Sequence, residues 1–121
     1  MHEAIINFRK KMADEAISKV MLYLSSLGLK KYRAILFGSY ARGDFNYASD
    51  IDLLIISDEL PDGLNERLSF LNLKRWDTPD VEPIGWTEKE YEMRKGKNDP
   101  FITLLGKEGV VIGEKGEVMA E

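Results

Sequence analysis

The sequence predicts an α/β (α+β) domain in which a small mixed sheet is flanked by helices. Short apolar runs bounded by glycine or proline alternate along the chain with longer amphipathic segments. No internal repeat, low-complexity stretch or linker divides the 121 residues. We therefore expect one domain over residues 1–112 and a polar C-terminal tail over residues 113–121.

The first element is expected to be a long amphipathic helix from about Glu3 to Leu27, because apolar residues recur at every fourth position. The residues that define this core-facing pattern are Phe8, Met12, Ala16, Val20 and Leu24, with Ile5, Ala13, Ile17 and Met21 beside them. Gly28 then ends the helix.

The remaining elements are four short strands separated by helices. The strands are expected over residues 32–37, 51–56, 81–86 and 109–112, and the helices over 39–42, 64–76, 88–94 and 101–105. Leu64, Leu68 and Leu71 are expected on one side of the third helix. Thr87 and Glu90 have the spacing of a capping box. Pro83 lacks a backbone donor and favours an edge strand or a bulge.

The composition excludes several function classes. A net charge of −4 argues against general nucleic-acid binding, which requires a strongly basic face. There is no cysteine and only one histidine, so a thiolate site or a histidine-centred metal site is not expected. No apolar run approaches the ~18 residues of a membrane span, and no signal-peptide core is present. These features predict a cytoplasmic protein.

Gly38 and Ser39 form the first half of the most informative motif and follow directly after the apolar run over residues 32–37. Glycine has no Cβ and lets the backbone approach a ligand closely. Ser39 is expected to be the N-cap of a short helix, whose free N–H groups suit a phosphate. Arg42, one short helical turn later, could also reach a phosphate, and Gly43 ends the helix.

Asp50 and Asp52 form the second half of the motif. Side chains alternate across a strand, so these two carboxylates are expected on one face, at the start of an otherwise apolar strand. Two neighbouring carboxylates repel each other unless a cation lies between them. Magnesium prefers oxygen ligands and usually takes one or two carboxylates together with substrate phosphates. The pattern therefore favours nucleotide chemistry.

The chain resembles the minimal nucleotidyltransferases of the DNA polymerase beta superfamily. Their signature is Gly-Ser, ten residues, then Asp-x-Asp, which Gly38-Ser39 and Asp50-Ile51-Asp52 match, together with Arg42-Gly43 and Ser49. The resemblance implies a polymerase-beta-like nucleotidyltransferase fold. It also implies transfer of a nucleoside monophosphate, AMP in the favoured case, from ATP or another nucleoside triphosphate to a hydroxyl, with two Mg²⁺ ions.

The family pattern further implies a third carboxylate on a neighbouring strand. Glu82 is favoured because it lies within the strand, and Asp80 is the alternative. The implied catalytic residues and metal ligands are then Asp50, Asp52 and Glu82. The implied nucleotide-binding residues are Gly38, Ser39 and Arg42.

Many members of this family act as the antitoxin of a HEPN-domain toxin, and some adenylylate the toxin. The resemblance therefore implies a HEPN-domain partner and a nucleotidyltransferase in an antitoxin role. Two alternatives stay open: a non-catalytic antitoxin of the same fold, and an enzyme that modifies a small molecule such as an antibiotic. The oligomeric state is also open. The aromatic residues Tyr40, Phe45 and Tyr47 could stack on a base or cover their own loop.

Overall fold

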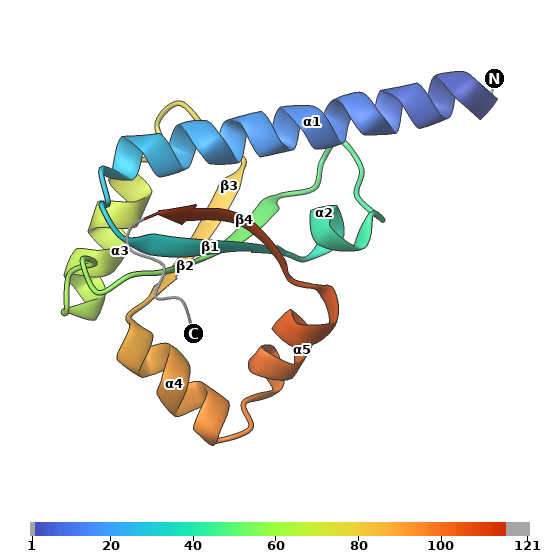
Figure 1. Cartoon of the computed structure of the whole chain (residues 1–121). Coiled ribbons are helices and arrows are strands. Elements are labelled where there is room, and N and C mark those ends of the chain that lie inside the picture. The colour runs from blue at the N-terminus through green and yellow to red at the C-terminus, as the bar shows by residue number, and fades with distance from the viewer. Residues whose placement is uncertain (1, 116–121) are drawn as a thin grey trace.

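A long helix, α1 (His2–Leu27), crosses one face of a four-stranded sheet in the computed structural model, which describes residues 2–115 (Figure 1). The strands are β1 (Tyr32–Phe37), β2 (Ile51–Ile56), β3 (Val81–Trp86) and β4 (Val110–Lys115). The other helices are α2 (Ser39–Arg42), α3 (Leu64–Leu73), α4 (Glu88–Gly96) and α5 (Pro100–Glu108). The expected class, a small mixed sheet flanked by helices, is confirmed.

The order of the strands in the sheet is β3-β2-β1-β4. β2 pairs parallel with β3 and antiparallel with β1, and β1 pairs antiparallel with β4. Pro83 therefore lies in an edge strand, where a missing backbone donor is tolerated. Asp52 is the register partner of both Phe37 and Glu82. The end of β1 and the starts of β2 and β3 thus meet at one end of the sheet.

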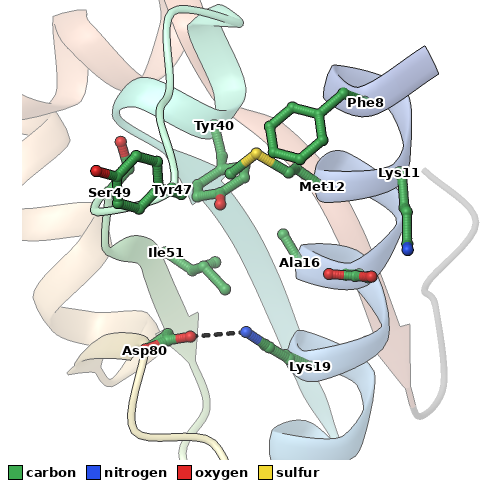
Figure 2. Close-up of a pocket in the computed structure, with 11 residues that line it drawn as sticks. Phe8, Lys11, Met12, Ala16, Lys19, Tyr40, Tyr47, Ser49, Ile51 and Asp80 are labelled. Atoms are coloured by element: carbon green, nitrogen blue, oxygen red, sulfur yellow. Dashed lines mark hydrogen bonds and ion pairs between the residues drawn. The ribbon is translucent and has the colours of Figure 1, made fainter. Parts of the chain in front are cut away.

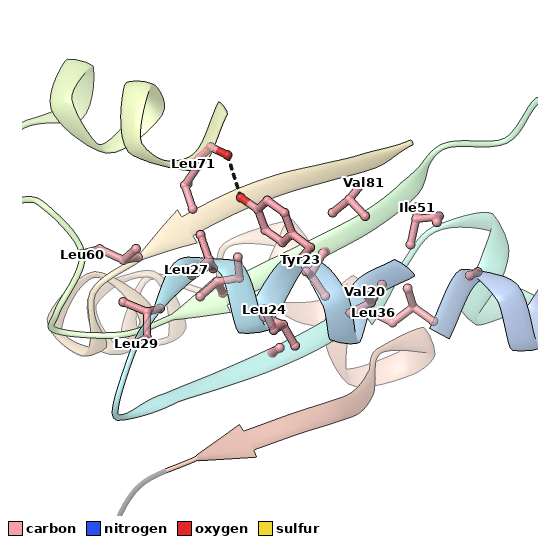
Figure 3. Close-up of a cluster of buried hydrophobic side chains, with 14 residues drawn as sticks. Val20, Tyr23, Leu24, Leu27, Leu29, Leu36, Ile51, Leu60, Leu71 and Val81 are labelled. Carbon is pink, nitrogen blue, oxygen red and sulfur yellow. Dashed lines mark hydrogen bonds between the residues drawn. The ribbon is translucent and has the colours of Figure 1, made fainter. Parts of the chain in front are cut away.

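One face of the sheet packs against α1 and α3 and forms the larger core cluster (Figure 3). The side chains that α1 contributes are Ala16, Val20, Tyr23, Leu24 and Leu27, and those from β2 are Ile51, Leu53 and Ile55. Tyr23 is fully buried, and its hydroxyl donates to the carbonyl oxygen of Leu71 at 2.8 Å, which joins α1 to α3. Burial raises the pKa of this hydroxyl, so it stays a donor at any physiological pH.

The predicted core is wrong for the N-terminal part of α1. Ile5 and Phe8 were expected to face the core, but their side chains are 58% and 56% exposed. Ile17 and Met21 are also exposed. Figure 1 shows that the helix projects past the sheet, so its first turns have no layer to pack against. An amphipathic pattern shows which face can be buried, and the width of the sheet decides how much of that face is covered.

The buried face of α3 also differs from the prediction. Leu71 is buried as expected, but Leu64 and Leu68 are exposed, and the second buried residue of this helix is Arg67. The helix ends at Leu73 rather than at residue 76. An arginine can replace a leucine on a core-facing side only if its charge is paired and its donors are bonded.

Arg67 meets both conditions. Its Nη1 donates to Glu90 Oε1 at 2.6 Å and to the Gly85 carbonyl at 3.2 Å, and its Nε donates to the Pro61 carbonyl at 2.9 Å. Glu90 also completes the predicted capping box with Thr87 at the start of α4, which is confirmed. The pair therefore fastens α3 to the beginning of α4.

We predict that Glu90→Gln lowers the free energy of unfolding by about 1–2 kcal/mol at pH 7, because glutamine can keep the cap but leaves Arg67 without a counter-charge. Burial opposes ionisation of Glu90, but the backbone hydrogen bond from Thr87 and the bond from Arg67 outweigh it and lower its pKa. This stabilisation is present above the ordinary glutamate pKa and is lost as the pH falls through the lowered value. Urea denaturation at pH 7 and pH 3 checks this, and an equal difference at both values would contradict it.

The opposite face of the sheet is covered by α4 and α5 and forms a second cluster, whose buried members are Ile35, Leu54, Ile56, Trp86 and Leu105. α5 begins earlier and ends later than expected. Asp99 caps it by accepting the N–H of Phe101 at 2.9 Å, and Pro100 occupies its first turn. Leu105 is therefore not the end of the helix, which continues to Glu108.

β4 extends to Lys115, so the boundary expected after residue 112 falls inside this strand. Pairing with β1 continues past a register shift between Ala34 and Ile35 and accounts for the extra residues, since Tyr32 is the register partner of Lys115. The rest of the expected tail, residues 116–121, lies outside the described residues. Within residues 2–115, no helix combines the length and the apolar character that crossing a membrane requires.

Candidate active site

A tight turn at Gly38 joins β1 to α2. Gly38 has φ 78° and ψ −156°, a conformation that essentially only glycine adopts. A Cβ at this position would overlap Oδ2 of Asp52 and lie 3.1 Å from its Cγ, so the turn approaches the carboxylate directly. Gly38 is also the N-cap residue of α2. The predicted N-cap role of Ser39 is therefore wrong, because Ser39 is already the first residue of the helix.

The carboxylates of the motif lie beside this turn. Asp50 immediately precedes β2, and Asp52 is its second residue. Asp52 and Glu82 are register partners on parallel strands, so their side chains project side by side from one face of the sheet. This is the face that carries Leu54 and that α4 and α5 cover farther along the strands. The structure thus brings Gly38, Asp50, Asp52 and Glu82 to one end of the sheet.

The electrostatic environment of Asp52 is unfavourable to its charge. Burial raises the pKa of this carboxyl, and the negative charges of Asp50 and Glu82 raise it further. Arg42 lowers this pKa, but by less than these contributions raise it. A site that disfavours its own negative charge gains free energy when a cation binds.

The two candidates for the third carboxylate form ion pairs with different cationic side chains. Glu82 is paired with Arg75 at 2.8 Å, on the face that carries Asp52. Asp80 is paired with Lys19 of α1 at 2.7 Å, on the side of the larger core cluster (Figure 2). The geometry therefore favours Glu82 as the carboxylate nearer to the motif.

The donor set fits a hard cation such as Mg²⁺. Asp50 and Asp52 offer only oxygen atoms, and one or two carboxylates completed by substrate oxygens are the usual magnesium environment in phosphoryl-transfer sites. Within residues 2–115, no three histidine, cysteine or acidic side chains lie close enough together to hold a metal ion by themselves. Glu82 would have to leave Arg75 to join the two aspartates.

Sequence reasoning missed one residue of this site. Glu108, at the end of α5, accepts the N–H of Gly38 at 2.6 Å and faces Nη1 of Arg42 at 3.2 Å. Arg42 also donates from Nε to Asp44 at 3.1 Å. In the sequence, the signal that could have pointed to Glu108 is its position, as an acidic residue between an apolar helix and the final strand.

The aromatic residues between the two halves of the motif have different surroundings. Phe45 is buried and stacks on Tyr40 with ring centroids 4.3 Å apart, and Arg9 of α1 lies over its other face at 4.6 Å. Phe45 therefore fills the core of its own loop and is not free to stack on a base. Tyr47 is 87% exposed and remains available.

A cavity of about 270 Å³ separates this loop from α1 (Figure 2). Phe8, Met12, Tyr40 and Ile51 are among the residues that line it. Ile51 and Asp52 project from opposite faces of β2, so the cavity lies behind the motif carboxylates rather than in front of them. It is not the space into which Asp52 points.

Comparison with known proteins identifies the relatives of this arrangement. The model of a protein family described as "Nucleotidyltransferase domain" matches residues 17–105, which include the turn, both aspartates and Glu82. "Putative protein adenylyltransferase MJ0141" of Methanocaldococcus jannaschii is 62% identical over 29 residues, 24% of this chain and 29% of that protein. "Putative protein adenylyltransferase MJ0604" of the same organism is 61% identical over 50 residues, 37% of this chain and 46% of that protein. The chain thus spans less than half the length of these curated relatives.

Two solved structures are similar in fold. The first is described as "Crystal structure of a putative nucleotidyltransferase from Sulfolobus solfataricus at 1.40 A resolution" and has a TM-score of 0.57 and 24% identity, over 94% of this chain and 92% of that one. The second, "Crystal structure of the toxin-antitoxin with AMP-PNP", has a TM-score of 0.56 and 19% identity, over 82% of this chain and 73% of that one. At these identities the likeness establishes the shared fold alone.

Proposed function

The chain belongs to the nucleotidyltransferase domain family, and on this premise we propose that it is a magnesium-dependent enzyme that transfers AMP from ATP to a hydroxyl group of a partner protein. The observation that carries the proposal is the close approach of the Gly38 turn to Asp52, with Asp50 and Glu82 beside it. A backbone turn without a Cβ can receive phosphate oxygens, and the neighbouring carboxylates can hold the cations that accompany them.

In the proposed reaction the acceptor oxygen attacks the α-phosphorus, the bond from that phosphorus to the bridging oxygen breaks, and pyrophosphate leaves. Asp50 and Asp52 would hold Mg²⁺, which when bound neutralises phosphate charge and favours ionisation of the acceptor hydroxyl. Ser39 and Arg42 donate to the β- and γ-phosphate oxygens. Glu82 receives the proton of the acceptor hydroxyl or acts as a further ligand. The protein otherwise contributes positioning.

The partner in this proposal is a HEPN-domain toxin. Its support is the fold shared with a solved toxin–antitoxin structure and the local identity to two proteins named as protein adenylyltransferases. A net charge of −4 argues against a nucleic-acid template, because such templates bind strongly basic surfaces. The acceptor hydroxyl is therefore expected on a second protein, which the present chain would silence by modification.

The test uses ATP labelled at the α-phosphate, MgCl₂, the purified protein and the product of the gene adjacent to its own. Label on the partner, absent with EDTA and with Asp52→Asn, is the expected result. The same label with ATP carrying it only at the γ-phosphate would contradict nucleotidyl transfer, because the γ-phosphate leaves in pyrophosphate. A stable complex of the two proteins without label would instead indicate an antitoxin that acts by binding and not by catalysis.

Glu82→Gln is expected to lower the rate of transfer by about 100-fold or more, because the amide can neither bind a cation strongly nor accept the proton. Asp80→Asn is the matched control, since Asp80 faces Lys19 of α1, and we expect a change of less than about threefold. The two carboxylates are each about half exposed, at 46% for Glu82 and 53% for Asp80, so neither change should affect folding greatly. Steady-state rates decide between them, and the reverse ranking would assign the third carboxylate to Asp80.

A second candidate function has one specific observation in its favour. The pairing of Glu82 with Arg75 leaves only two of the three expected carboxylates without a cationic partner among the described residues. This arrangement suits a non-catalytic antitoxin of the same fold that neutralises its toxin by contact. The two functions differ in whether covalent label appears on the partner.

A further inference from the structure

The carboxylate of Glu108 lies against the Gly38 turn, although the two residues are 70 positions apart in the chain. Its side chain is only 10% exposed, and both of its oxygens have partners. Oε2 accepts the N–H of Gly38 at 2.6 Å, and Nη1 of Arg42 lies 3.2 Å from Oε2 and 3.3 Å from Oε1. A carboxylate so withdrawn from water requires such partners, because an unpaired buried charge is strongly destabilising.

Arg42 is held from two sides. Nη1 faces Glu108, Nε donates to Asp44 at 3.1 Å, and Nη2 donates to no atom of residues 2–115. The side chain is nevertheless about half exposed, so the guanidinium is fixed and still accessible. A long side chain that is already fixed loses less conformational entropy when it binds a ligand. Arg42 is therefore prepared to receive an anion through its remaining N–H groups.

The backbone of the turn depends on the same carboxylate. The N–H of Gly38 donates to Glu108, while the carbonyl of Gly38 accepts the N–H of Arg42 at 3.0 Å. Backbone conformations as uncommon as that of Gly38 persist only where the surroundings hold them. Glu108 thus contacts Gly38, the N-cap residue of α2, and Arg42, the last residue of that helix.

We infer that Glu108 is a positioning residue for nucleotide binding, which holds the Gly38–Ser39 turn and the Arg42 guanidinium in the arrangement that receives the triphosphate. The inference rests on the proposed function, because that function assigns the turn and Arg42 to the phosphates. Glu108 itself touches neither the nucleotide nor the acceptor. It lies outside the span that matches the family, residues 17–105.

The test compares the wild type with Glu108→Gln by calorimetric titration of α,β-methylene ATP in MgCl₂, since the α–β bridge of this analogue is not cleaved. Glutamine can still accept the Gly38 N–H but no longer pairs with Arg42. We expect Kd to rise by about tenfold or more, while the transfer rate at saturating ATP stays within about threefold. Simple removal of a negative charge beside a triphosphate would act in the opposite direction and tighten binding. Unchanged or tighter binding would overturn the inference.

A double-mutant cycle separates positioning from a general effect on folding. Arg42→Gln should weaken binding by itself, and adding Glu108→Gln to it should cost little more, since Glu108 acts through Arg42. Additive losses would mean a merely structural role and would also overturn the inference. Glu92→Gln, an exposed position on α4, is the control and should bind as the wild type does.

The same experiments distinguish failure of the enzyme proposal from failure of the positioning role of Glu108. If the wild type binds the analogue but transfers no label from ATP, catalysis is disproved, and the Kd values still decide the role of Glu108. If the wild type binds no nucleotide at all, both proposals fall. If transfer is normal and Glu108→Gln binds the analogue as well as the wild type does, only the positioning role falls.

Discussion

Asp52→Asn is expected to abolish nucleotidyl transfer and at the same time to raise the melting temperature of the metal-free protein. The loss of activity, at least about 100-fold, follows from replacing a charged cation ligand by a neutral amide. The gain in stability follows from the surroundings of Asp52. Burial and the charges of Asp50 and Glu82 raise the pKa of Asp52, so the ionised form of this carboxyl destabilises the folded state. Asparagine removes that charge without creating a cavity.

The measurement is a thermal melt in EDTA alongside a transfer assay in MgCl₂. Asp77→Asn is the matched control, because Asp77 is exposed and outside the site, and both quantities should stay at the wild-type value. A variant that loses activity but melts at a lower temperature would indicate misfolding instead. Wild-type activity in Asp52→Asn would show that the assignment of Asp52 as a metal ligand is wrong.

The strands could be read from the sequence because their signals are local. β1, β2 and β3 have the predicted ends, since each is a short apolar run closed by a turn residue. β2 is apolar on both faces after Asp52, which is typical of a central strand covered on both sides. The placement of Asp52 opposite Glu82 then follows from the pairing of β2 with β3.

The helices were less predictable because burial depends on what lies opposite. The apolar pattern of α1 continues through Ile5 and Phe8, but the sheet does not reach that far. The buried position of Arg67 requires carbonyl groups from Pro61 and Gly85 and the charge of Glu90, none of which a helical period contains. Tertiary partners thus override the local pattern.

The candidate site likewise has one part that the sequence predicts and one part that only the tertiary structure shows. Gly38, Asp50 and Asp52 form a linear motif with a chemical reason for each residue, and their roles in binding remain predictions. Glu108 has no such local signal, since its contact with Gly38 is made only when α5 folds back onto the end of β1. A residue that acts by holding others is found from its contacts rather than from its neighbours in the sequence.

Gly38→Ala is expected to impair both stability and transfer. Alanine at φ 78° and ψ −156° is strained, which should lower the free energy of unfolding by about 1–3 kcal/mol. The new methyl group would also overlap Oδ2 of Asp52. Either the carboxylate or the turn must then move, and a displacement of this kind lowers the rate of a reaction that depends on positioning, here by at least about tenfold.

Gly43→Ala separates strain from displacement. Gly43 also has a positive φ, of 87°, but a Cβ there would meet no atom within 4 Å among the described residues. We expect it to lose about 1–2 kcal/mol of stability while the rate of transfer by the folded protein is unchanged. Urea denaturation and transfer assays on the two variants provide the comparison. An equal loss of rate in both would attribute the effect to backbone strain in α2, whereas a loss confined to Gly38→Ala would tie the turn to the carboxylate of Asp52.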